Sequence, residues 1–218
     1  MEYFAGLAVS MAETHVCVMH RDGAVVYEVK VPSTPADIAA GLANAPVCGR
    51  IVFETGRMAP MLYHRLSQLG LPIFCIESRQ AHQALKSLAT HKTDRNDARG
   101  LAHFARTGFF KPVYVKSLPA HALWSLIIAR KKLVGQRVTL ENQIRGLAVV
   151  FGVRLPRALT AAFIRQALRA SEGIAGLSAA VRGLVAARAA VLAAVTAIDA
   201  DLRRLVRASA ALSTSAES

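Results

Sequence analysis

The order of short apolar runs and turn signals most narrows the folds open to this chain. Three buried strands are predicted at residues 3–10, 14–20 and 24–31. Between the second and third strands, Arg21-Asp22-Gly23 is typical of a hairpin turn. Three consecutive strands joined by short turns indicate an antiparallel meander.

Helices and strands then alternate. Helical patterns over residues 35–45, 59–69, 79–89 and 94–107 are separated by strands at 50–54 and 71–76. The element order β-β-β-α-β-α-β-α predicts a mixed α/β domain with three antiparallel strands first, which is the ribonuclease H-like order. We place the end of this domain at residue 117.

Residues 118–207 have the character of a helical region rich in Ala, Leu, Val and Arg. A long helix is predicted at 118–151 and a shorter one at 156–170. From Leu177 to Leu205 apolar residues step at 4 and 3, with Arg188 at the one missing step. This spacing predicts an antiparallel coiled-coil arm that can join copies of the chain, and residues 208–218 are expected to be a disordered tail.

Basic charge is concentrated in the helical region. The chain has 218 residues and a net charge of +13, and residues 118–218 hold 14 Lys and Arg against 5 Asp and Glu. Because so few acidic residues can pair with these basic residues, the excess positive charge favours binding to a polyanion, most simply nucleic acid. A membrane surface, or basic side chains that only contact solvent, are the alternatives. No stretch of about 20 residues lacks charge, so no membrane-spanning helix is predicted.

The three cysteines, Cys17, Cys48 and Cys75, lie in apolar runs. An odd number of buried thiols is typical of a reduced, cytoplasmic protein, and no Cys/His spacing predicts a zinc site.

Candidate metal ligands lie in the stretch His91-Lys92-Thr93-Asp94-Arg95-Asn96-Asp97-Ala98-Arg99-Gly100. Thr93 is a good N-cap, and the i, i+3 spacing puts Asp94 and Asp97 on one helix face, where two oxygen donors can hold Mg²⁺ or Mn²⁺. An ordinary capped helix with surface charges fits the same pattern. In an open α/β sheet, functional side chains gather where strands end and helices begin. Glu54, at the end of the fourth predicted strand, is therefore expected to lie near Asp94 and Asp97.

Several short motifs, taken in order and spacing, resemble the Asp-Glu-Asp-Asp (DEDD) insertion-sequence transposases, which are related to Piv-type DNA invertases. The matching residues run from about 3 to 156, and more weakly to 207. They are Gly6-Leu7-Ala8-Val9-Ser10, Phe53-Glu54-Thr55-Gly56, Leu71-Pro72, Arg79-Gln80-Ala81-His82, residues 91–100, Thr107-Gly108-Phe109, Lys116-Ser117 and Asn142-Gln143-Ile144-Arg145-Gly146-Leu147.

The resemblance implies four metal-binding carboxylates, which fall at Ala8, Glu54, Asp94 and Asp97. Alanine has no oxygen donor, so a metal-dependent DNA strand-transfer activity is expected to be impaired. The resemblance also implies DNA as substrate, an element-encoded guide RNA in many members, and a C-terminal serine domain. No serine near residues 208–218 matches that domain, and a shortened copy is the expectation.

Eight basic residues are the predicted phosphate contacts: Lys92, Arg95, Arg99, Arg130, Lys131, Lys132, Arg137 and Arg145. Three functions remain open. The first is a DNA transposase or recombinase with an impaired site. The second is a non-catalytic fragment that binds DNA or RNA or poisons a full-length partner through mixed dimers. The third is a junction-resolving nuclease on the same fold.

Overall fold

The computed structural model describes residues 2–79, 93–156 and 161–215. Two compact units are present, Met1–Leu118 and Pro119–Ser218, and each is described by itself. The predicted helix at 79–89 and the basic residue Lys92 lie outside the described residues, apart from residue 79.

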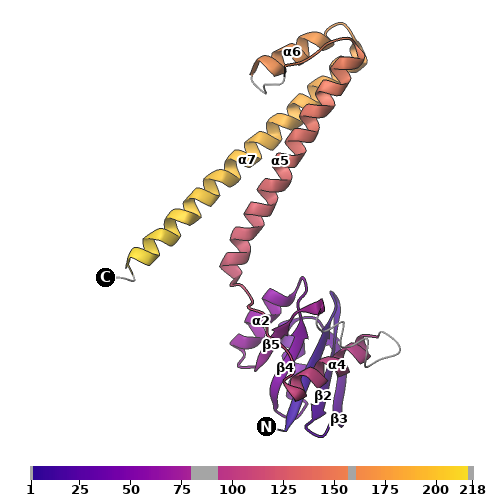
Figure 1. The fold of residues 1–218 in the computed structure, drawn as a ribbon, viewed down its shortest axis with the longest axis vertical. Coiled ribbons are helices and arrows are strands. Elements are labelled where there is room, and N and C mark those ends of the chain that lie inside the picture. Colours follow the sequence, from indigo (N-terminus) through magenta and orange to yellow (C-terminus); the bar gives the residue numbers. More distant parts are fainter. Residues whose placement is uncertain (1, 80–92, 157–160, 216–218) are drawn as a thin grey trace. The chain divides into compact units, whose positions relative to one another are not determined.

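A five-stranded sheet forms the centre of the first unit. Its strands are β1 (Tyr3–Val9), β2 (Glu13–His20), β3 (Val25–Pro32), β4 (Cys48–Glu54) and β5 (Ile73–Ile76). They lie side by side in the order β3-β2-β1-β4-β5 (Figure 1). Strands β1, β2 and β3 pair antiparallel, whereas β4 runs parallel to both β1 and β5. The predicted mixed α/β class is confirmed.

Helices cover both faces of this sheet. Helices α1 (Pro35–Ala43) and α2 (Ala59–Gln68) pack on one face, where Leu7 contributes to the core. Helix α4 (Asp94–Thr107) covers the other face, where Phe4 and Ala8 contribute. The alternation of side chains along β1 therefore puts residue 8 under α4.

Local sequence signals determine both ends of α4. The Thr93 hydroxyl accepts a hydrogen bond from the Asn96 N–H at 3.2 Å, as an N-cap does. The helix ends at Gly108, whose φ of 69° is left-handed and whose N–H donates to the Phe104 carbonyl at 2.9 Å. These signals explain why the predicted range 94–107 agrees with the structure.

Helix α4 lies in backbone contact with the sheet at Gly6. A Cβ at residue 6 would lie 2.2 Å from both the Ala98 carbonyl oxygen and the Ala102 nitrogen. Only a residue without a side chain fits there. The close approach fixes the height of the helix above β1.

The described residues of the second unit form the helices α5 (Leu118–Val150), α6 (Ala161–Ser171) and α7 (Ala175–Ser215). A small apolar core joins them, formed by Ile144, Phe163, Ala167, Leu177 and Val181. Ion pairs connect α5 to α7: Arg188 lies 2.8 Å from the buried Glu141, and Arg130 lies 2.5 Å from Asp199.

The two long helices come close together near the ends that the core joins, where α6 also lies, and spread apart toward their other ends (Figure 1). Away from that core the predicted seam is half-buried at Leu133, Leu140 and Val195, and Leu205 is 41% exposed. A helical pair is therefore present, but continuous coiled-coil packing along its length stays a prediction.

Helix α7 differs from the expectation at its end. It continues to Ser215, through residues for which a disordered tail is predicted. Alanine is the best helix former, and adding residues to an existing helix needs no new nucleus, so the Ala-rich sequence extends it.

Within the described residues, one helical segment, Ala175–Arg207 of α7, is long and apolar enough to cross a membrane by length and composition. Length and composition are weak evidence for a membrane span, because charged side chains of this segment form ion pairs within the unit. Arg188 and Asp199 both pair with residues of α5.

Replacement of Gly6 tests the close approach of α4. Gly6→Ala forces a methyl group into the helix backbone, so we expect the first unit to lose about 3 kcal/mol or more of stability. The measurement is a urea titration followed by the NMR signals of β1. Gly135→Ala, in α5 of the other unit, is the control, because a Cβ there meets no atom within 4 Å, so the unfolding that the β1 signals report should not change. A Gly6→Ala protein as stable as the wild type would contradict the contact.

Candidate functional site

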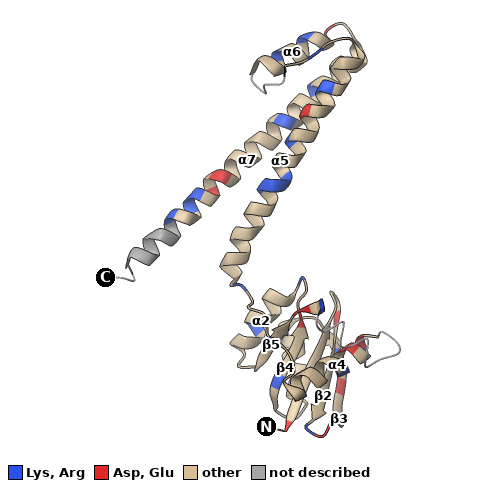
Figure 2. Cartoon of the chain, viewed as in Figure 1, with Lys and Arg blue, Asp and Glu red and all other residues tan. Residues whose placement is uncertain are grey.

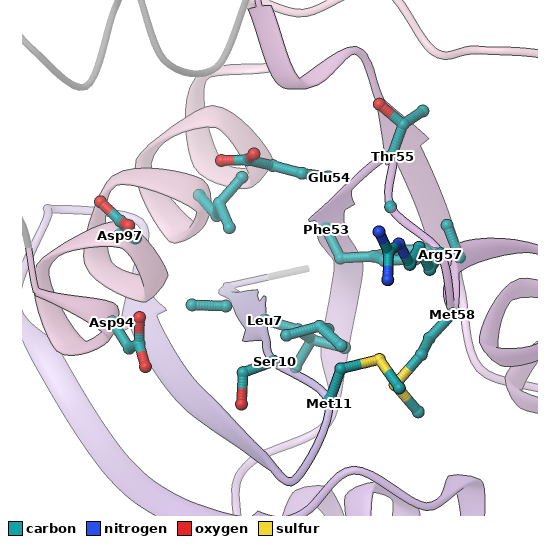
Figure 3. A pocket seen from close by; sticks show the side chains of 15 residues that line it. Leu7, Ser10, Met11, Phe53, Glu54, Thr55, Arg57, Met58, Asp94 and Asp97 are labelled. Atoms are coloured by element: carbon teal, nitrogen blue, oxygen red, sulfur yellow. The ribbon is translucent and has the colours of Figure 1, made fainter.

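A cavity of about 430 Å³ opens where β1 and β4 end and α4 begins. Its lining includes Ala8, Glu54, Arg57, Asp94 and Asp97. The three acids predicted from the sequence therefore border one cavity, although they come from distant parts of the chain. Figure 3 shows their carboxylates on the side formed by α4, with Arg57 and Met58 across from them.

Strand register brings positions 8 and 54 together. Leu7 of β1 pairs with Phe53 of β4 in the parallel ladder, and Ala8 and Glu54 follow one residue further along. Both belong to the sheet face that α4 covers, since Ala8 and Val52 pack in the core beneath that helix. An acid at position 8 would therefore point toward the same cavity.

The first turns of α4 supply the other two acids. Asp94 is exposed and Asp97 is half-buried, and both line the cavity together with Leu101, one turn further on. Acidic residues in the first turn are stabilised by the helix dipole, and the Asp97 N–H donates to the Thr93 carbonyl at 2.9 Å.

Carboxylate oxygens are the donors that Mg²⁺ and Mn²⁺ prefer, so the chemistry of the lining suits a divalent cation. The arrangement is nevertheless incomplete. Throughout the described part of the chain, no group of three His, Cys, Asp or Glu side chains lies close enough to hold a metal ion. Ala8, which is 9% exposed, contributes only a methyl group.

The polar neighbours of Ala8 do not supply the missing oxygen. The Ser10 hydroxyl donates to the Glu13 carbonyl at 2.8 Å and accepts from the Glu13 N–H at 3.2 Å, so it closes the turn between β1 and β2. The Glu13 carboxylate pairs with Lys30 at 2.5 Å. The described residues therefore do not form a complete metal site.

Two predicted phosphate contacts have an intramolecular partner. Arg95 and Arg99 both bind Glu28 of β3, with N–O distances of 2.5–3.0 Å. Their hydrogen bonds and charges, those of Arg99 foremost, lower the pKa of Glu28 to about 2 although burial acts in the opposite direction. Glu28 is thus ionised at neutral pH and offsets part of the positive charge beside the cavity.

In the second unit, Lys and Arg residues occur along α5, α6 and α7 (Figure 2). Arg130 pairs with Asp199, Arg137 lies 3.7 Å from Glu141, and the Arg145 guanidinium stacks 5.0 Å from the centre of the Phe163 ring. Lys131 and Lys132 are exposed, and no ion pair to either is found among the described residues.

Sequence reasoning missed Glu28 and Arg57. Glu28 contacts residues far along the chain, so no local pattern announces it. Arg57 is a basic residue in the cavity lining. It directly follows Glu54-Thr55-Gly56, where the chain leaves β4, and this position is the sequence signal that could have identified it.

Comparison with known proteins shows the family of the chain. The family model of DEDD transposases of the IS110 type, described as a transposase, matches residues 5–151. The transposase for insertion sequence element IS1111A of Coxiella burnetii (strain RSA 493 / Nine Mile phase I) is 28% identical over 152 residues. That match covers 70% of this chain and 40% of the relative, so the chain spans about two fifths of the relative's length. The match over most of the first unit and all of α5 shows that the chain belongs to the IS110-type DEDD transposase family.

Proposed function

We propose that this chain acts in DNA transposition, with the first unit as a ribonuclease H-like domain of catalytic type and the second as a nucleic-acid-binding helical unit. The observation that carries the proposal is the shared cavity. Glu54, Asp94 and Asp97, which the family resemblance assigns as acids of the site, border one cavity inside the segment that the transposase model matches.

The cavity also supports impaired chemistry in this chain. The resemblance places a fourth carboxylate at position 8, and Ala8 lines the cavity at that place without an oxygen. A bound Mg²⁺ or Mn²⁺ stabilises charge on a phosphate when its ligands are complete. With the ligands incomplete, we expect the chain to bind nucleic acid and to show little or no strand cleavage.

The cysteines support an intracellular, reducing location such as the bacterial cytoplasm. Cys17, Cys48 and Cys75 are free and buried, and burial raises their pKa values to about 12, 11 and 11. Thiols held neutral in this way are unreactive structural groups. A DNA partner is present in that compartment.

Salt-dependent DNA binding tests the role of the helical unit. Because Lys131 and Lys132 are exposed, we expect them to contact phosphates. A Lys131→Ala/Lys132→Ala protein should bind duplex DNA more weakly at 100 mM salt and lower the slope of log K against log salt by up to about 2. Fluorescence anisotropy over a salt series measures both quantities, and an RNA competitor shows whether RNA is preferred.

Lys30→Ala is the control, because Glu13 already pairs with that lysine in the other unit. The control should leave the slope within experimental error of the wild type. Affinity that does not change with salt, or a slope that the double substitution leaves unchanged, would refute binding through phosphate contacts.

We also propose that the helical unit joins two copies of the chain. Its helix α5 exposes a group of large apolar side chains within one short stretch, with Trp124 50%, Ile127 41% and Ile128 51% exposed. Exposed apolar groups of this size are usually covered by a partner, and two half-buried helical pairs can cover each other.

Analytical ultracentrifugation over a concentration series checks this association. The wild type should form dimers, and Ile127→Glu/Ile128→Glu should shift it to monomers because charge is placed in the interface. Val47→Glu, at an 86% exposed position of the first unit, is the control and should stay dimeric. A wild type that sediments as a monomer at all concentrations would exclude the helical unit as a dimer interface.

A further inference from the structure

Glu28 occupies a defined place beneath α4. Glu28 of β3 pairs with Cys17 of β2, and Cys17 pairs with Gly6 of β1, so the three residues form one row across the sheet. Residues of one row share a sheet face. This row therefore runs from the backbone contact at Gly6, past a fully buried cysteine, to a carboxylate near the sheet edge.

The carboxylate of Glu28 holds two successive turns of α4. Arg95 donates to its Oε2 from Nε at 2.9 Å and from Nη2 at 2.5 Å. Arg99 donates to Oε1 from Nε at 2.6 Å and to Oε2 from Nη2 at 3.0 Å. The two arginines are spaced i, i+4 and lie on one helix face. Charge-assisted bonds of this forked kind fix orientation as well as distance.

The start of α4 lacks buried apolar anchors. Thr93, Asp94 and Arg95 are exposed, Asn96 and Asp97 are half-buried, and the first buried side chain is Ala98. The Thr93 cap is a contact within the helix itself. Ion pairs from Glu28 therefore supply tertiary contacts to turns that packing alone leaves weakly held.

The ion pairs of Glu28 with Arg95 and Arg99 form a clamp on one face of α4. The opposite face of the helix carries the acids of the cavity. Asp94, Asp97 and Leu101 line the cavity, while Arg95 and Arg99 reach toward Glu28. A rotation of α4 about its axis would move both sets together. The contact at Gly6 fixes the height of the helix, whereas Glu28 opposes its rotation.

We propose that Glu28 is a positioning residue, which fixes the rotation of the first turns of α4 and so aims Asp94 and Asp97 into the cavity. The importance of that aim rests on the proposed function, but the clamp itself is a property of the folded chain. Its test therefore uses neither DNA nor metal, and its failure is distinguishable from failure of the transposase proposal.

Amide hydrogen exchange of the full chain measures the clamp residue by residue. In Glu28→Gln the amides of residues 96–100 should exchange about tenfold faster, equivalent to about 1.4 kcal/mol of local opening. Amides of β5 should stay within about twofold of the wild type, because this strand lies at the sheet edge opposite β3 and distant sites act independently. Glu28→Asp keeps the charge and should recover most of the protection, which a loss of packing alone would not explain.

Glu13→Gln is the matched control, since it removes the neighbouring Glu13–Lys30 pair of the same sheet without touching α4. Its exchange at residues 96–100 should equal that of the wild type. If Glu28→Gln fails to fold, Arg95→Gln tests the clamp from the helix side, where the side chain is 62% exposed. Exchange that rises uniformly through the first unit, or stays unchanged at residues 96–100, would overturn the proposal.

Discussion

The backbone contact between α4 and β1 at Gly6 is the constraint on which the candidate site depends. Because residue 6 has no side chain, the helix lies directly against the central strand. That height brings the first turns of α4 to the place where β1 and β4 end. The acids of one helix and one strand can then share a cavity, and Ala8, two residues beyond Gly6, lies in its lining.

Charge in this protein is organised by a few acids that hold arginines. The sequence has 27 Lys and Arg against 14 Asp and Glu, yet Glu28, Glu141 and Asp199 all bind guanidinium groups. Glu28 supports the start of α4. Glu141 and Asp199 connect α5 with α7 through Arg188 and Arg130. The positive charge left for a polyanion is therefore carried by side chains such as Lys131 and Lys132.

Local signals in the sequence predicted the strands and the helix α4, but they did not predict the length of α7 or the partners of the charged side chains. The range of α4 could be predicted because Thr93 caps one end and Gly108 the other. The place of Glu54 at a strand end and the i, i+3 spacing of Asp94 and Asp97 predicted that they border one site. The partners of Arg95, Arg99 and Arg130 could not be predicted, because each lies on an element remote in sequence. Lone basic residues therefore look like phosphate contacts until the tertiary structure supplies an acid.

Restoration of the acid at position 8 tests the shared cavity most directly. If Ala8 leaves an otherwise suitable site incomplete, Ala8→Asp should bind Mn²⁺ at least about tenfold more tightly than the wild type in isothermal titration calorimetry. The neutral Ala8→Asn should gain much less, and adding Asp97→Asn to Ala8→Asp should remove the gain. An Ala8→Asp protein that folds but binds Mn²⁺ no better than the wild type, or a gain that survives loss of the Asp97 carboxylate, would contradict a common cavity for these acids.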